Sequence, residues 1–220
     1  MGTFGKRLLL ISVLIALPAS TQALITYNTF GEPGDAYNTG GGWLVNGSAN
    51  PPQPFVGEAF AFIPTTSGNL NLLNLAISAG SGSLANISIA ANSGGNLPGA
   101  HLENFLNVPS PGPFGLNNPV TSLSSTIHPF LQAGQTYWVA VEPASPTASI
   151  TVNQNNQGLL APQAQEFSPS AWLAKGNKTT FAFSVDVIEV PEPSATALTV
   201  LIIPVLIRSF LRRFPGPKSL

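Results

Sequence analysis

The chain has 220 residues, no cysteine, 21 glycines and 21 prolines, and a formal net charge of −1 at pH 7. Without cysteine it can form neither a disulfide framework nor a thiolate metal site, and its glycine and proline content disfavours long helices. Residues 24–189 hold eight carboxylates and two lysines, a net charge of −6, which excludes the basic surface that nucleic-acid binding requires.

The N-terminal segment 1–23 has the layout of a secretory signal peptide. Lys6 and Arg7 precede an apolar run at 8–17, and small residues follow up to Ala23. A basic start, a short apolar core and a small-residue end are the three parts of such a signal. We therefore expect export and cleavage by signal peptidase after Ala23. An uncleaved anchor helix is disfavoured, because the apolar run is short for a membrane span.

A loop is expected at 31–42, where glycine, asparagine and acidic residues are concentrated. Glu32, Asp35 and Asn38 supply hard oxygen ligands, which makes them weak candidates for a calcium site. A solvated turn has the same composition and is the simpler interpretation.

Residues 24–189 are expected to form one domain built from strands. Segments 86–89 and 149–152 alternate polar and apolar residues, which is the period of a half-buried strand. Segment 137–141 is apolar at every position, as in a central strand that is covered on both faces or has one face lined by aromatic residues. Clusters of glycine, asparagine and proline separate these runs. The pattern predicts an antiparallel β-sandwich of jelly-roll or immunoglobulin-like type.

Three other segments carry local predictions. Apolar and polar or small residues alternate through 180–187, which predicts the clearest strand of the chain, with one face in water. Within 70–77 the apolar positions change parity, which predicts a bulge or a change of sheet near Leu72. Glycine and proline predict a turn at 97–99.

Aromatic residues offer the one binding chemistry that the sequence suggests. Trp43 and Trp172 are candidates for stacking on the apolar faces of sugar rings, whereas Trp138 lies inside an apolar strand and is assigned to the core. The two histidines, His101 and His128, lack metal-ligand spacing, and no nucleophile motif occurs. We therefore expect no catalytic residue, no metal and no cofactor, and a chain that is not an enzyme.

The C-terminal segment 190–220 has three parts in a fixed order. They are the motif Val190, Pro191, Glu192, Pro193 and Ser194, an apolar span at 195–207, and a basic tail at 208–220 that contains Arg208, Arg212 and Arg213. Proline fixes its own backbone and disfavours helix at the residue before it, so the motif is expected to be extended. The apolar span predicts a short transmembrane helix, which the arginines stop at the membrane surface.

This order resembles the PEP-CTERM sorting signal of exported bacterial proteins. The resemblance implies that an exosortase-like membrane enzyme recognises and cleaves the motif 190–194, in bacteria that make exopolysaccharide. It further implies transient or permanent anchoring in the inner membrane, followed by transfer to the cell surface or extracellular matrix. An ordinary C-terminal membrane anchor with a proline-rich spacer is the alternative.

Residues 24–189 resemble the choice-of-anchor domains of bacterial surface proteins. The likeness is carried by segments 28–31, 37–43, 93–99 and 128–138, and it implies no known reaction. We therefore expect a non-enzymatic surface or matrix protein associated with exopolysaccharide. The alternatives are a carbohydrate-binding module that uses exposed tryptophans and a plainly membrane-anchored surface domain.

The signal-peptide prediction fixes the first residue of the exported protein. Small residues at Thr21 and Ala23 flank the expected cleavage point, so N-terminal sequencing of the exported protein should return Leu24. Recovery of Met1 or Gly2 would contradict cleavage.

Overall fold

Strands make up all of the regular secondary structure in the computed structural model, which describes residues 22–50, 55–79, 83–168 and 171–189. The predicted signal peptide, apart from its last two residues, and the whole segment 190–220 lie outside the described residues. Within the described part, no helix is long and apolar enough to cross a membrane. The prediction of an all-β, antiparallel domain is confirmed.

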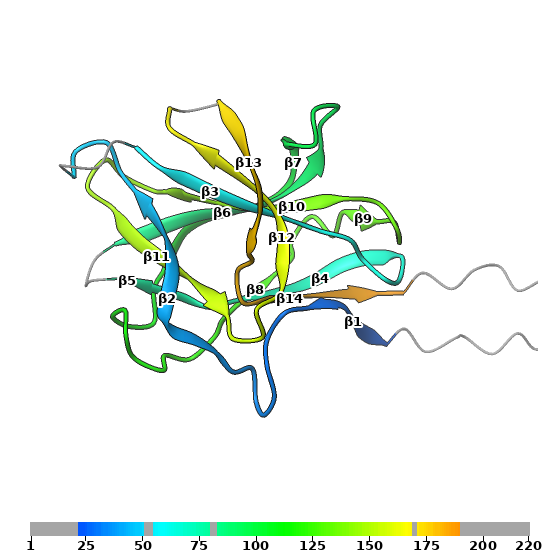
Figure 1. Ribbon diagram of the computed structural model, residues 1–220. Helices are drawn as coiled ribbons and strands as arrows, with labels where there is room; N and C mark the ends of the chain where they lie inside the picture. The colour runs from blue at the N-terminus through cyan, green and yellow to red at the C-terminus, as the bar shows by residue number, and fades with distance from the viewer. Residues whose placement is uncertain (1–21, 51–54, 80–82, 169–170, 190–220) are drawn as a thin grey trace, which may run out of the picture. The chain divides into compact units, whose positions relative to one another are not determined.

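The strands form three antiparallel sheets (Figure 1). The six-stranded sheet has the order β13 (Trp172–Thr179), β12 (Leu160–Glu166), β3 (Gly57–Phe62), β10 (Tyr137–Pro143), β6 (Leu84–Asn92) and β7 (Pro98–Pro109). The five-stranded sheet has the order β1 (Ala23–Asn28), β14 (Phe183–Ile188), β4 (Gly68–Leu75) and β8 (Thr121–Ser124), and β9 (Phe130–Leu131) also pairs with β4. The three-stranded sheet has the order β2 (Tyr37–Asn46), β11 (Ser149–Asn155) and β5 (Ile77–Ala79).

Backbone hydrogen bonds join the two smaller sheets into one layer. Ala76 is the single residue between β4 and β5, and its N–H donates to the carbonyl of Ala182 at 3.0 Å. The N–H of Asn153 donates to Ala76 and the N–H of Ala182 donates to Asn153, both at 2.9 Å. A register shift between β4 and β14 lies beside Leu72, which confirms the predicted bulge.

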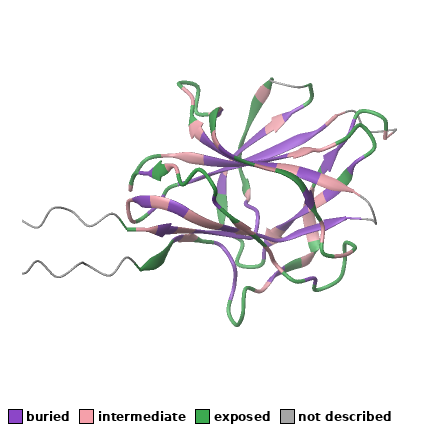
Figure 2. Cartoon of the chain, turned by 180° about the vertical axis from the view of Figure 1, so that it is seen from behind, coloured by how far each residue is buried: buried purple, intermediate pink, exposed green. Residues whose placement is uncertain are grey.

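Strand β3 shows how the large sheet packs on both of its faces. Phe60 and Phe62 belong to the main core between the layers, whereas Ala59 and Ala61 belong to a second cluster on the outer face, and all four are buried. Alternation of aromatic and small residues follows from the period of a strand. Figure 2 shows buried residues along the facing strands and exposed residues mainly in loops and edge strands.

Strand β10 lies between β3 and β6, and residues 138–141 are buried on both faces. This confirms the central strand predicted at 137–141. Trp138 is fully buried, as predicted for a core residue.

Aromatic rings connect the two layers across the main core. The ring of Phe60 packs edge-on against Phe181 with centroids 4.6 Å apart, and Phe62 packs edge-on against Phe183 at 5.9 Å. Tyr27 contacts Phe62 at 5.5 Å and Phe183 at 5.0 Å. Aromatic pairs of this kind contribute about 0.5–1.5 kcal/mol beyond the area they bury. This cluster supplies much of the packing that a chain without disulfides requires.

The predicted water-facing side of segment 180–187 is wrong for most of its length. Thr180, Ala182 and Ser184 are at most 4% exposed. The N–H of Thr180 donates to the carbonyl of Leu159 at 3.0 Å, and Ala182 lies at the junction of the two smaller sheets. Other segments of the chain therefore cover positions that would be exposed in an isolated strand of alternating polar and apolar residues.

The turn predicted at 97–99 is also wrong, because Pro98 is the first residue of β7. The turn lies at 93–97, where the N–H of Ser93 donates to the carbonyl of Leu97 at 2.8 Å. Proline is tolerated at the start of an edge strand, since its missing N–H is not needed for pairing there.

The loop predicted at 31–42 is a strand from Tyr37 onward. Only residues 32–35 form a turn, closed by mutual backbone bonds of 2.7 and 3.0 Å between Gly31 and Ala36. A Cβ placed on Gly42 would lie 2.2 Å from Thr151 Cγ2 in the neighbouring strand. Glycine is therefore required there by close strand packing, and not by a turn.

Removal of the central ring of the aromatic cluster should test this account. The substitution Phe60→Ala leaves a cavity between the layers and should lower the free energy of unfolding by about 3–5 kcal/mol. Leu160→Ala, at a side chain that is 65% exposed, should change it by less than about 0.5 kcal/mol. Urea unfolding of both variants checks the difference, and equal effects would contradict the assignment of Phe60 to the core.

Candidate functional site

The three weak calcium candidates lie on a turn and its adjoining strand. Glu32 and Asp35 are exposed in the 32–35 turn, and Asn38 is exposed in β2. The side-chain oxygen of Asn38 accepts a hydrogen bond from the N–H of Gly40 at 3.1 Å. Among the described residues, no group of three or more His, Asp or Glu side chains is placed to hold a metal ion.

The two tryptophans predicted to stack on sugars are half-buried. Trp43 packs against Phe60 at a centroid distance of 5.8 Å, and its Nε1 donates to the carbonyl of Thr179 at 2.8 Å. Trp172 packs against the outer-face alanine cluster, where a Cβ on Gly57 would lie 3.4 Å from its Cη2 atom. Part of each ring is therefore already covered by the protein.

The histidines lie in separate hydrogen-bonded settings. His101 is exposed and its Nδ1 lies 2.9 Å from Asn104 Oδ1. The Nδ1 atom of His128 donates to the carbonyl of Leu70 at 2.9 Å. The imidazole of His101 is thus bonded within β7, whereas that of His128 is bonded to β4.

Glu103 is a buried carboxylate that fixes a loop. It accepts hydrogen bonds from the hydroxyls of Ser125 and Thr126 and from the N–H groups of Thr126 and Ile127, at 2.6 to 3.2 Å. Burial acts to raise the pKa of Glu103, but these bonds together hold it below its ordinary value. A carboxylate stabilised in its ionised form by its own loop suits a structural role.

Glu58 is the buried carboxylate on the inner face of β3. Its two oxygens accept hydrogen bonds from Gln163 Nε2 at 2.8 Å and Gln165 Nε2 at 2.6 Å. Burial raises the pKa of Glu58 from 4.5 to about 7, against the opposing effects of these bonds and the positive charge of Lys175.

Glu58 does not share a face with the buried Glu166 of the neighbouring strand. In the pairing of β12 with β3, Gln165 lies opposite Glu58 and Glu166 lies opposite Gly57. Because successive side chains point to opposite faces of a sheet, the two carboxyl groups lie on different sides. They therefore cannot flank one substrate, as the acid and base of a glycosidase do.

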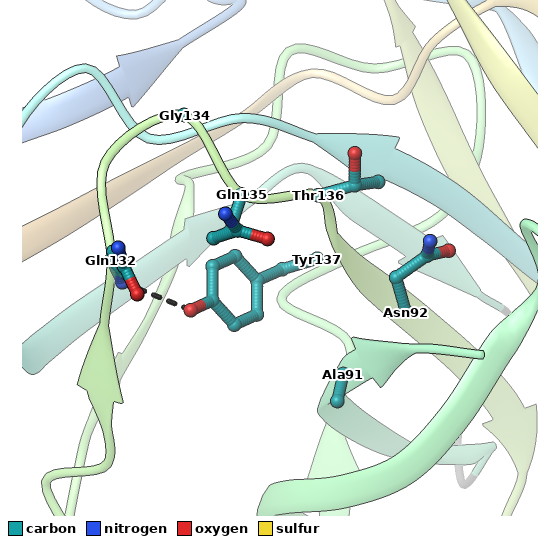
Figure 3. Close-up of a pocket in the computed structure, with 7 residues that line it drawn as sticks. All are labelled: Ala91, Asn92, Gln132, Gly134, Gln135, Thr136 and Tyr137. Carbon is teal, nitrogen blue, oxygen red and sulfur yellow. Dashed lines mark hydrogen bonds between the residues drawn. The ribbon is translucent and has the colours of Figure 1, made fainter. Parts of the chain in front are cut away.

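A polar recess lies where the loop 132–136 meets the ends of β6 and β10 (Figure 3). It has a volume of about 450 Å³, and its side chains come from Ala91, Asn92, Gln132, Gln135, Thr136 and Tyr137. The register of the large sheet places Ala91 directly opposite Tyr137.

Backbone contacts set the shape of the recess. Gly134 has a φ of 77°, which turns the loop, and its N–H donates to the carbonyl of Pro64 at 3.0 Å. The N–H of Gln132 donates to the Tyr137 hydroxyl at 2.9 Å, the bond drawn in Figure 3. The first bond holds the middle of the loop, and the second joins its two ends.

The recess offers hydrogen-bonding groups without acid, base or nucleophile of the usual catalytic types. Its lining has three amides, one aliphatic hydroxyl and one phenol, and no carboxylate, amine or imidazole. Amides both donate and accept hydrogen bonds. The arrangement therefore suits binding of an uncharged polar ligand.

The sequence interpretation missed this recess. The apolar pattern assigns 137–141 to a central strand and gives no separate role to Tyr137. An aromatic residue at the first position of a strand, directly after the polar run 134–136, is the signal that could have indicated a ring at the domain surface.

A second depression, of about 360 Å³, differs in its chemistry. It is lined by residues that include Asp35, Tyr37, Asn117 and Asn118. Tyr37 is buried and its hydroxyl donates to the carbonyl of Asn118 at 2.8 Å. This depression therefore carries a carboxylate and presents little aromatic surface.

Comparison with family models, curated proteins and solved structures gives no match for this chain. Its function is therefore argued from its own residues.

The raised pKa of Glu58 makes stability depend on pH in a defined direction. The folded pKa, about 7, lies above the ordinary value of 4.5, so its contribution is fully present below pH 4.5 and is lost as pH rises through 7. Glu58→Gln should abolish that loss and stabilise the domain at pH 8 by up to about 3 kcal/mol.

Urea unfolding at pH 5 and pH 8 checks this expectation. Glu32→Gln, in the exposed turn, controls for the change in net charge. A stability difference between the Glu58→Gln variant and the parent that is the same at both pH values would contradict the burial argument.

Proposed function

We propose that this chain is an exported, non-enzymatic bacterial surface or extracellular-matrix protein, addressed by a signal peptide at 1–23 and a PEP-CTERM-like sorting signal at 190–220. The observation that carries the proposal is the order of motif, apolar span and basic tail in the last thirty-one residues. The domain between the signals is proposed to be a jelly-roll or immunoglobulin-like ectodomain of the choice-of-anchor kind.

The pairing of the first and last strands supports this organisation. Ala23 in β1 lies opposite Ile188 in β14, so the chain enters and leaves the described domain at neighbouring points (Figure 1). Both signals are thus joined to adjacent positions of one domain. That geometry allows a folded domain to be held close to a membrane from either end.

The use of the buried carboxylates supports a binding or structural role over catalysis. Glu103 is fully engaged by its loop, and Glu58 is engaged by two glutamine amides. Neither carboxylate lines the recess at Tyr137 or the second depression. A surface protein needs no catalytic carboxylate in such a cavity.

The C-terminal signal is proposed to act by positioning. Prolines at 191 and 193 keep the motif out of a helix, and the apolar span retains it at the outer face of the inner membrane. Each of Arg208, Arg212 and Arg213 opposes further translocation by about 2.5–3.5 kcal/mol at the bilayer centre. The motif then stays within reach of an exosortase-like enzyme.

Substitution of the motif separates sorting from plain anchoring. Replacement of Pro191, Glu192 and Pro193 by alanine should leave an uncleaved, membrane-retained protein in the native host. Replacement of Pro215 and Pro217 by alanine removes as many prolines from the tail and should leave processing intact. Intact mass and the membrane-bound fraction provide the measurements.

An ordinary membrane anchor would keep the protein in the membrane whether or not the motif is present. If the motif variant and the parent have the same mass and the same membrane fraction, the sorting proposal fails and the chain is a plainly anchored surface domain.

A further inference from the structure

We propose that the recess at Tyr137 is a binding site for a neutral saccharide, in which the tyrosine ring stacks on a sugar and the amides of Gln132 and Gln135 bind its hydroxyls. This inference deepens the proposed function by naming a ligand class, and it rests on that proposal only for the source of the ligand. The site differs from the one expected from Trp43 and Trp172.

The ring of Tyr137 is held in one orientation before any ligand binds. Its hydroxyl accepts the N–H of Gln132 at 2.9 Å, and its ring packs against Phe62 at a centroid distance of 5.8 Å. Tyr137 is nevertheless only half-buried. Figure 3 shows Gln135 on one side of the ring and the small Ala91 on the other. A fixed, partly exposed ring suits the apolar C–H face of a sugar.

The polar groups around the ring match sugar hydroxyls, which both donate and accept hydrogen bonds. Asn92 accepts Trp138 Nε1–H with its Oδ1 at 2.9 Å on the opposite face of the sheet, because Ala91 is the residue paired with Tyr137, so Asn92 borders the recess only at its rim. The side-chain amide of Gln135 is exposed and makes no hydrogen bond within the described residues. Thr136 lies on the side of Asn92, at the same rim (Figure 3).

Charge narrows the ligand class to uncharged sugars. The lining contains neither an acidic side chain nor a basic one, so an ionised sugar would find no partner there. The net charge of −6 over residues 24–189 further disfavours acidic saccharides. The volume of about 450 Å³ lies within the usual range for small-molecule sites, roughly 300–1,000 Å³.

The test uses the full-length chain purified in detergent and titration calorimetry with neutral trisaccharides of glucose, galactose, mannose and N-acetylglucosamine. At least one should bind, and the acidic trisaccharide of galacturonic acid should not. Tyr137→Leu should weaken binding roughly tenfold through loss of the ring. Gln135→Ala should weaken it about two- to tenfold through loss of a hydrogen bond.

Two further variants separate the site from general effects on the fold. Tyr137→Phe keeps the ring and should retain binding within a few-fold, whereas Asn117→Ala, in the second depression, should bind like the parent. Thermal unfolding of each variant shows that it is folded.

Three results would overturn the inference. They are the absence of binding to every neutral trisaccharide, equal binding of the acidic one, and folded Tyr137→Leu and Gln135→Ala variants that bind like the parent. None of these three results contradicts the sorting proposal, provided that alanine replacement of Pro191, Glu192 and Pro193 still prevents processing. Conversely, saccharide binding that follows these variants stands even if the C-terminal segment proves to be a plain anchor.

Discussion

The packing of Phe60 and Phe62 against Phe181 and Phe183 is the contact on which the rest of the domain depends. It joins the six-stranded sheet to the opposite layer at the point where the two smaller sheets meet. No disulfide assists it. Tyr137 packs against Phe62, so the candidate site is built directly on this aromatic cluster. Close packing of the aromatic cluster therefore holds the recess in a fixed shape.

The pKa values of the two buried carboxylates Glu58 and Glu103 shift in opposite directions. Glu58 accepts bonds from two neutral amides, and these do not offset the loss of water around it, so its pKa rises. Glu103 accepts four bonds from one loop, and there the bonds prevail and the pKa falls. Hydrogen-bond number, and not burial alone, decides which form of a buried carboxyl group the fold favours.

Sequence patterns identified those features that depend on neighbours along the chain. The central strand at 137–141 and the bulge near Leu72 both follow from periodicity, and the structure confirms them. Strand β13, with two lysines and a glycine, has no apolar alternation, because it is an exposed edge. Strand β2 contains three consecutive glycines, and the close approach of Thr151 in the neighbouring strand explains the one at Gly42. The recess depends on Ala91 pairing with Tyr137, a register that no local pattern records.

The antiparallel pairing of β1 with β14 has a mechanical consequence. Leu24, the first residue expected after signal cleavage, faces Val187 at the end where β1 begins and β14 ends. Hydrogen bonds between antiparallel strands run perpendicular to the strands. Tension that draws the two termini apart would therefore load the hydrogen bonds between β1 and β14 one after another, starting from the end where β1 begins. A tether at one terminus would instead load these hydrogen bonds together, in shear. The domain therefore resists a pulling force best when it is attached through one terminus only.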